Sequence, residues 1–320
     1  MTETVRAAAL NAYGGPEVLE VMMVEQPPMA LHNEVLIDVR AAGVNPFDCK
    51  IRKGMFERIF PRPFPLVPGT DFAGVVVEKG FDVSELEVGD KVYGLLDPGR
   101  FGTYTERTVS LSYAVRRMPS NLSFEEAASI PMGAVTAWFA LSNVAGVSKG
   151  RRVLVHGGAG GVGSAAIQIA KHFGAWVATT CSERNVEYCR SLGADEVVDY
   201  AATDIREALS DIDVVLDPIG GETNLKSYEV IRPGGVMLVI LRMDPIEMKG
   251  SPALCEKYGV TRKEVAFSAQ PEILDLMRPL YEASVLKPTV SEVLPLEEAA
   301  AAHAQIETGH TRGKIVLSLS

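Results

Sequence analysis

The sequence predicts an α/β fold in which a doubly wound parallel sheet is inserted into an irregular β-barrel domain. Residues 150–240 alternate short apolar runs with helical stretches, which is the pattern of a parallel sheet covered by helices on both faces. Residues 1–120 instead combine strand-like segments with many glycine and proline turns. Residues 271–317 leave the alternating pattern, and we expect them to rejoin the first domain.

Three segments of the first domain have the composition of strands, namely residues 35–44, 72–78 and 91–95. Glycine and proline interrupt the chain between them, as in residues 60–65 and 67–70. Turn residues at this density favour a compact barrel over a layered sheet.

The second domain is expected to begin at a helix. Ser123 fits the N-cap and Glu126 the third helical position, which together form a capping box. Helices are also expected through residues 167–170 and 186–190. The expected buried parallel strands are residues 152–156, 176–180, 196–199, 213–216 and 236–240.

The C-terminal stretch predicts two amphipathic helices, residues 271–282 and 295–307, and a closing strand at 313–317. We therefore expect one domain to comprise residues 1–122 plus 266–320. Residues 123–265 would form the inserted domain.

The composition is that of an acidic globular protein. The chain has 320 residues, and 31 Lys and Arg against 41 Asp and Glu give a net charge of −10. This balance argues against a nucleic-acid or anionic-membrane protein, because both need a basic face. Four cysteines cannot form a disulfide scaffold. The N-terminus lacks a targeting pattern and the longest apolar run has only six residues, so we expect a cytoplasmic protein.

A glycine-rich turn at residues 157–163 is the strongest motif. Gly158, Gly160 and Gly163 satisfy G-x-G-x-x-G, an apolar strand precedes them and a helical stretch follows. Such glycines allow a tight turn, close approach of the backbone to a pyrophosphate, and packing of the helix on the strand. We therefore expect a dinucleotide to lie against Gly158, Ala159, Gly160, Gly161, Val162 and Gly163. The alternative is a purely structural glycine turn.

The end of the second expected strand favours NADPH over NADH. Ser182 can donate a hydrogen bond and Arg184 can pair with a 2′-phosphate, whereas the strand tip itself carries no acid. Glu183 keeps NAD open as an alternative, because an inward carboxylate there would select the free 2′-hydroxyl.

With these motifs the chain resembles the medium-chain dehydrogenase/reductase superfamily, in its zinc-independent quinone oxidoreductase (zeta-crystallin-like) branch. The resemblance covers nearly the whole length. It is carried by residues 41–48, 67–74, 88–94, 131–137, 156–163 and 309–315. It implies a Rossmann-type sheet inserted into a GroES-like β-barrel catalytic domain. It also implies an NADPH-dependent reductase of quinones or α,β-unsaturated carbonyl compounds, and a homodimer.

The resemblance also implies roles for single residues. The residue matching Asn45 lies by the nicotinamide ribose and the substrate, and the one matching Thr136 lies near the nicotinamide. Residues matching Ser182, Arg184 and Tyr200 surround the 2′-phosphate. Main-chain contacts along the cofactor groove are implied for Ile219 and Ile240.

The zinc-dependent branch would place Cys at Asn45 and His at Thr70, together with a four-cysteine lobe. An amide and a hydroxyl are poor zinc ligands, and no cysteine occurs between Cys49 and Cys181. We therefore expect no metal. Cys49 itself is expected to be a packed thiol.

Without a metal, the candidate catalytic residues are Asn45 and Lys50. Asn45 could hydrogen-bond a substrate carbonyl or the ribose, and Lys50 could stabilise a developing enolate. The alternatives are a turn residue and a solvated charge. Phe47 and Tyr93 are candidate substrate contacts, with core packing as the alternative.

Two other functions stay open. An enoyl-thioester reductase of the same fold would need a basic groove, for which Arg52, Lys53 and Arg58 are candidates unless they are ordinary solvated charges. A non-enzymatic, NADPH-binding, crystallin-like protein is the other. For a homodimer, the apolar run at 236–241 could pair with its copy if it lies at the sheet edge. We assign no chemistry to His156, expected to be packed, or to His303, expected on a surface helix.

Overall fold

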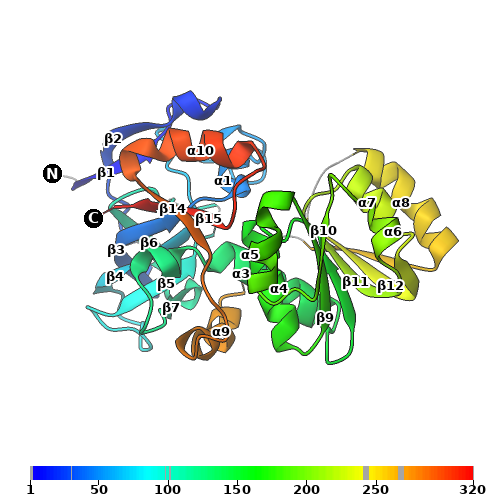
Figure 1. The fold of residues 1–320 in the computed structure, drawn as a ribbon. Helices are drawn as coiled ribbons and strands as arrows, with labels where there is room; N and C mark the ends of the chain where they lie inside the picture. Colours follow the sequence, from blue (N-terminus) through cyan, green and yellow to red (C-terminus); the bar gives the residue numbers. More distant parts are fainter. Residues whose placement is uncertain are drawn as a thin grey trace. The chain divides into compact units, whose positions relative to one another are not determined.

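The computed structural model describes residues 3–29, 31–97, 99–100, 102–240, 245–265 and 270–319. The chain divides into two compact units (Figure 1). Unit 1 comprises Met1–Val135 and Ala269–Ser320, and unit 2 comprises Thr136–Ser268. The two divisions lie 13 and 3 residues C-terminal of the expected 122/123 and 265/266 boundaries.

Unit 1 is built on a strongly bent, mainly antiparallel sheet of seven strands, with a separate two-stranded ladder of β1 and β2. The main sheet has the order β14-β15-β3-β4-β5-β7, and β6 also pairs with β3. The strands of unit 1 are β1 (Thr4–Ala9), β2 (Glu20–Glu25), β3 (Glu34–Gly43), β4 (Asp71–Lys79), β5 (Lys91–Leu95), β6 (Arg107–Leu111), β7 (Val115–Arg117), β14 (Val290–Pro295) and β15 (Lys314–Ser318). Its helices are α1 (Pro46–Arg52), α2 (Phe124–Ala128), α9 (Glu272–Glu282) and α10 (Ala299–Glu307), and the division between units falls within α3 (Pro131–Trp138).

The C-terminal segment completes this sheet, as predicted. β15 lies between β14 and β3 and pairs with β3 in antiparallel register, Val316 opposite Gly43. The predicted capping box at the start of α2 is also present. The Glu126 N–H donates to Ser123 Oγ over 3.2 Å, and the Ser123 N–H donates to the Glu126 carboxylate over 2.9 Å.

Unit 2 is a doubly wound sheet of six parallel strands in the order β10-β9-β8-β11-β12-β13, with helices on both sides (Figure 1). This is the Rossmann-type order 3-2-1-4-5-6, and it confirms the predicted fold class. The strands are β8 (Arg152–Val155), β9 (Trp176–Cys181), β10 (Glu196–Asp199), β11 (Ile212–Asp217), β12 (Ile231–Ile240) and β13 (Thr261–Val265). The helices are α4 (Gly161–His172), α5 (Val186–Ser191), α6 (Ile205–Ala208), α7 (Glu222–Ser227) and α8 (Pro245–Tyr258).

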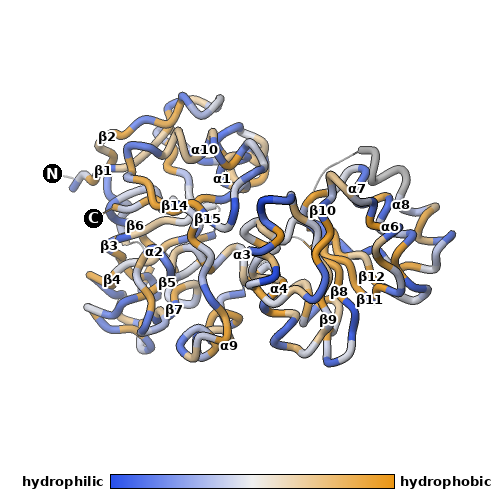
Figure 2. Tube along the Cα trace, viewed as in Figure 1, coloured by the Kyte–Doolittle hydropathy of each residue, from blue (hydrophilic) through white to orange (hydrophobic). Residues whose placement is uncertain are grey.

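The central strands of unit 2 are mostly apolar because helices cover both faces of a parallel sheet. Figure 2 shows β8, β11 and β12 as a hydrophobic centre, and every residue of β11 is buried. The condition under which the apolar run 236–241 could pair with its copy, a place at the sheet edge, is not met. β12 lies between β11 and β13, so β13 is the terminal strand on that side in the part of the chain that the structure describes; Leu241 lies outside it.

No helix among the described residues is long and apolar enough to cross a membrane.

Candidate functional site

The glycine-rich turn joins β8 to α4 and packs directly on β9. Gly157 has a φ of +61°, which glycine adopts without strain. The Gly158 N–H donates to the Thr180 carbonyl over 2.9 Å. A Cβ at Gly158 would lie 2.0 Å from Thr179 Oγ1, and one at Gly163 would lie 2.2 Å from the Gly157 carbonyl oxygen. Both glycines are therefore required by close packing, whether or not a ligand binds.

The start of α4 has the properties of an anion site. Its N-cap is Gly160, which provides no side-chain cap for the first N–H groups of the helix. Uncapped N–H groups and the helix dipole favour a phosphate at this end. A Cβ at Gly160 would approach the nearest atom only to 3.3 Å, so protein packing alone explains this glycine less well than Gly158 or Gly163.

The candidate cofactor residues gather at the carboxyl edge of the parallel sheet. Ser182 follows β9 and Tyr200 follows β10, and the last residues of these strands, Cys181 and Asp199, are in register. Ile219 follows β11 and Ile240 ends β12. Ligands of open α/β sheets bind along this edge. The structure thus brings these residues to one edge of one sheet.

The side chains at this edge differ in exposure. Arg184 is exposed, Tyr200 is 57% exposed and Ile219 is 43% exposed. Ser182 is half-buried and its hydroxyl accepts a hydrogen bond from Asn185 over 3.2 Å. Thr136, on α3, is half-buried.

Ile219 lies against the glycine turn. Its Cδ1 would be 2.8 Å from a Cβ at Gly157. The buried Asp217 carboxylate fixes this loop by accepting the N–H groups of Ile219 over 2.8 Å and Gly220 over 2.9 Å. Sequence reasoning missed Asp217; its signal is an acid that ends a mostly apolar strand, with two glycines three and four residues further on.

His156 is buried, as expected for a packed residue. Its Nδ1 lies 3.0 Å from Thr180 Oγ1 and its Nε2 lies 2.7 Å from Ser227 Oγ. Burial lowers the pKa of the imidazole, so it is held neutral inside unit 2.

A buried polar cluster occupies unit 1 around the start of α1. Asn45 is the N-cap of that helix, and Pro46 follows at the first helical position. The Asp48 carboxylate, at the third position, accepts the Asn45 N–H over 2.8 Å. Asn45 and Asp48 thus form a capping box at this end of α1, and the Asn45 amide also reaches neighbouring side chains.

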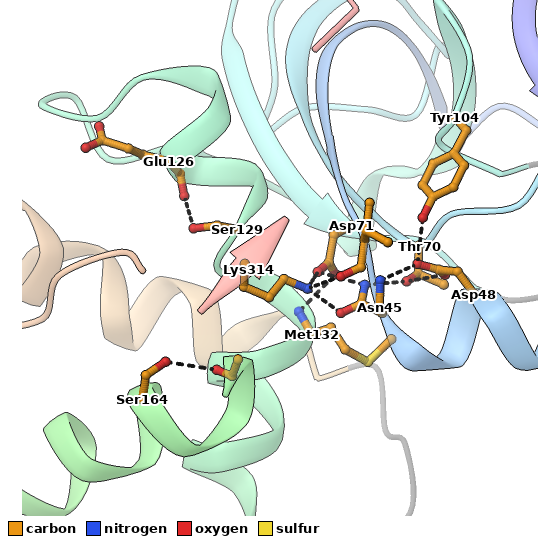
Figure 3. Close-up of polar contacts among 12 residues, drawn as sticks. Asn45, Asp48, Thr70, Asp71, Tyr104, Glu126, Ser129, Met132, Ser164 and Lys314 are labelled. Carbon is orange, nitrogen blue, oxygen red and sulfur yellow. Dashed lines mark hydrogen bonds and ion pairs between the residues drawn. The ribbon is translucent and has the colours of Figure 1, made fainter. Parts of the chain in front are cut away.

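The Asn45 amide is the centre of this cluster (Figure 3). Its Nδ2 donates to Thr70 Oγ1 over 3.3 Å and to Asp71 Oδ2 over 3.1 Å. Its Oδ1 accepts from the Lys314 ammonium. Asn45 is only 3% exposed.

Two buried carboxyl groups flank the amide. Asp48 accepts from the Thr70 hydroxyl and from the Tyr104 hydroxyl, each over 3.2 Å. Burial, and then the charge of Asp71, raise the pKa of Asp48 to about 7. Asp71 accepts from Lys314 over 3.2 Å and from the Met132 N–H over 2.9 Å. Burial raises the pKa of Asp71, and the ammonium of Lys314 opposes this rise.

His303 lies on α10, one face of which is exposed as expected of a surface helix, but its own side chain is fully buried on the inner face. Its Nε2 lies 3.1 Å from the Tyr104 hydroxyl and its Nδ1 lies 3.3 Å from an Arg52 nitrogen. Arg52 is itself buried and pairs with Glu307 over 2.7 Å. Burial, and then the charge of Arg52, lower the pKa of His303 to about 3. The buried face of α10 thus bonds to α1, which a short amphipathic pattern did not reveal.

The remaining candidates of unit 1 are less accessible than expected. Tyr93 is fully buried and its hydroxyl donates to the Leu274 carbonyl over 3.1 Å, so a substrate could touch it only after a rearrangement. Phe47 is half-buried and packs on Phe56 at 5.0 Å between ring centroids. Lys50 is half-buried on α1. Cys49 is buried, and burial raises the pKa of its thiol to about 12, as expected for a packed residue.

Sequence reasoning assigned no role to three members of the cluster. Asp71 and Lys314 lie in the segments 67–74 and 309–315, which carry the family resemblance, and Tyr104 lies outside them. The signal in the sequence that could have identified Asp71 and Lys314 is that each is a charged residue at the start of a mostly apolar strand, β4 and β15 respectively.

No group of three or more His, Cys, Asp and Glu side chains is placed to hold a metal ion within the described ranges.

Comparison with known proteins gives three family matches. Residues 32–119 match the alcohol dehydrogenase GroES-like domain, residues 192–317 match the zinc-binding dehydrogenase family, and residues 124–220 match the C-terminal domain of alanine dehydrogenase/PNT.

Individual relatives match over almost the whole chain. The mitochondrial NAD(P)H oxidoreductase RTN4IP1 of Mus musculus is 34% identical, over 98% of this chain and 89% of its own length. The 2-methylene-furan-3-one reductase of Solanum lycopersicum is 37% identical, over 98% and 78%. Among solved structures, the quinone oxidoreductase from Coxiella burnetii is 32% identical with a TM-score of 0.92, over 99% of this chain and 100% of its own.

Proposed function

Because the chain belongs to the quinone oxidoreductase branch of the medium-chain dehydrogenase/reductase superfamily, we propose that it is a zinc-independent, NADPH-dependent reductase of quinones or α,β-unsaturated carbonyl compounds. The observation that carries the proposal is the uncapped, glycine-preceded start of α4 at the carboxyl edge of a parallel sheet. Unit 2 would then bind the cofactor, and unit 1 would supply the acceptor site.

The residues at the sheet edge fit an NADPH molecule. The first N–H groups of α4 would receive the pyrophosphate, with Ile219 beside the glycine turn and Thr136 toward the nicotinamide. The exposed Arg184 would pair with the 2′-phosphate, flanked by Ser182 and Tyr200. The bound nicotinamide supplies the hydride for the reaction.

On the acceptor side, Asn45 and Lys50 are the proposed catalytic residues. Both hydrogens of the Asn45 amide already point at Thr70 and Asp71, so Asn45 would bind a substrate carbonyl by exchanging one of these bonds. Lys50 would stabilise negative charge on the enolate oxygen. Phe47 remains the candidate for an apolar contact with the acceptor.

The donor set supports the proposed zinc independence. An amide and a hydroxyl, Asn45 and Thr70, stand where the zinc branch has ligands, and the Asn45 oxygen is engaged by an ammonium.

The thioester alternative loses part of its support. Arg52 is buried and Lys53 pairs over 2.8 Å with the same Glu307 carboxylate, so neither presents a free charge to a thioester handle. Of the three basic residues, Arg58 alone remains a candidate for contacting the thioester handle, with a solvated charge as the alternative.

The test is NADPH oxidation by the purified chain with a panel of small quinones, alkenals, cyclic enones and their CoA thioesters. We expect turnover with a quinone or a free enone, and NADPH preferred to NADH. Faster turnover of the thioesters would favour the alternative substrate class. NADPH binding with no turnover of any acceptor would refute the proposal in favour of a non-enzymatic protein.

Two further proposals accompany this function. A cytoplasmic location is tested by cell fractionation, and a homodimer by sedimentation of the purified protein. Within the described residues, β13 ends the sheet of unit 2 on one side. Such a dimer would cover this edge strand.

A further inference from the structure

A buried lysine from the last strand contacts the candidate catalytic amide. Lys314 is the first residue of β15 and is only 4% exposed. Its ammonium donates to the Val44 carbonyl over 3.1 Å, to Asn45 Oδ1, and to Asp71 Oδ2 over 3.2 Å. Figure 3 shows the lysine side chain directed at Asn45 and Asp71.

These three contacts satisfy the ammonium completely. A lysine has three N–H donors and no acceptor, and three oxygen atoms face it here. Burying a charge is costly unless it is paired and hydrogen-bonded, so this site is built for a cation. An uncharged amine would lack the attraction to the buried Asp71 carboxylate.

The same contacts fix which way the Asn45 amide points. Because Nζ can only donate, the atom facing it must be the amide oxygen. The amide nitrogen then faces Thr70 and Asp71, where both of its hydrogens find acceptors. A rotation of the amide by 180° would instead place the amide N–H group, a second donor, against the ammonium.

We propose that Lys314 is a positioning residue, a built-in cation that holds the Asn45 side chain in one orientation for the reaction. The inference rests on the proposed function, because it takes Asn45 as the group that meets the acceptor carbonyl. In this role Lys314 itself contacts neither the substrate nor the cofactor. Its charge also opposes the rise that burial causes in the pKa of Asp71, and so favours the carboxylate form that accepts from the amide.

The orientation is tested by nuclear magnetic resonance on the full-length, ¹⁵N-labelled chain. The side-chain amide pair of Asn45 is assigned by its loss in an Asn45→Ser variant. We expect Lys314→Met to shift this pair and to speed its exchange with water, and the exposed Lys149→Met to change neither. An Asn45 pair unaffected by Lys314→Met would overturn the proposal.

A second measurement uses the wild-type protein, so its result does not depend on whether a variant folds. A saturated, buried ammonium exchanges its hydrogens slowly, so we expect a resolved lysine NH₃⁺ signal at neutral pH. Lys314→Arg identifies it by its loss. Absence of any protected ammonium signal in the wild type refutes a built-in cation.

Kinetics test the consequence for the reaction. We expect Lys314→Met to lower kcat by about tenfold or more, because misorienting a catalytic group by a small distance is costly. KM for NADPH should stay within about twofold of the wild type, because the residues proposed to hold the pyrophosphate and the 2′-phosphate lie in unit 2. In Lys314→Ala, n-propylammonium replaces the missing methylenes and charge and should restore kcat, whereas propan-1-ol should not. Unchanged kcat in Lys314→Met refutes the positioning role.

The two proposals fail in different ways. A wild type without turnover refutes the proposed function, and the resonance experiments still decide the orientation of Asn45. A wild type that turns over, with Lys314→Met equally active, refutes the inference alone.

Discussion

Replacing His303 with glutamine should change how the stability of the protein depends on pH. Burial lowers the pKa of His303 from 6.5 to about 3, and raises that of Asp48 from 3.8 to about 7. The Tyr104 hydroxyl lies between the two groups. Between about pH 4 and 6.5 the folded chain therefore keeps a proton on the aspartate, whereas the unfolded chain keeps one on the histidine.

The two residues have opposite effects on the free energy of unfolding. A depressed histidine pKa gives stability that is present above pH 6.5 and is lost as pH falls toward 3. A raised aspartate pKa gives stability that is present below pH 3.8 and is lost as pH rises toward 7. Each slope is about 1.4 kcal/mol per pH unit, so within this window they offset one another in the wild type.

His303→Gln removes one of the two slopes. From pH 4.5 to 6.5, the wild type should gain about 2 kcal/mol of unfolding free energy relative to the variant, over and above the constant cost of the substitution. Urea unfolding followed by circular dichroism at three pH values measures this difference. His32→Gln, at an exposed histidine of the same unit, should follow the wild type at every pH. If the gap between the wild type and His303→Gln is constant with pH, the buried neutral histidine is the wrong explanation.

Three further outcomes are expected. Gly163→Ala should reduce NADPH binding and stability, because its Cβ would lie 2.2 Å from the Gly157 carbonyl oxygen, whereas Gly160→Ala, at 3.3 Å, should lose less stability; calorimetric titration and thermal melting of both variants decide this. Arg184→Glu should weaken the binding of NADPH by about tenfold or more and change the binding of NADH little. An equal loss of affinity for both cofactors in equilibrium titrations, or the same loss of NADPH affinity in Arg190→Glu, would contradict a 2′-phosphate contact. Dialysis against EDTA should leave the reductase rate unchanged, and a rate that falls and returns with Zn²⁺ would disprove zinc independence.

The parallel sheet could be predicted because its strands are buried on both faces. The predicted strand 196–199 coincides with β10, and the predicted strand 213–216 lies inside β11. β13 was missed because its residues Thr261–Val265 include three charges and one fully buried side chain. As a terminal strand it pairs on one side only, so its sequence need not be apolar.

The polar cluster of unit 1 could be predicted only in part. Asn45 was identified from the residues of one short loop and the family resemblance. Its partner Lys314 lies 269 residues further along the chain, and the contact of Tyr104 with His303 spans 199 residues. Local periodicity carries no information on such pairs. The burial of His303 was not predicted, because a short alanine-rich helix gives little indication of which face is buried.

The insertion of unit 2 into unit 1 affects the order in which the chain can be completed during synthesis. Unit 2 is one continuous stretch, so it can fold as soon as it has left the ribosome. Unit 1 must wait, because β15 separates β14 from β3 in its sheet and follows unit 2 in the chain. A message truncated just before codon 314 would therefore yield a protein with unit 2 intact. Its Asp71 carboxylate, however, would be left without an ammonium partner.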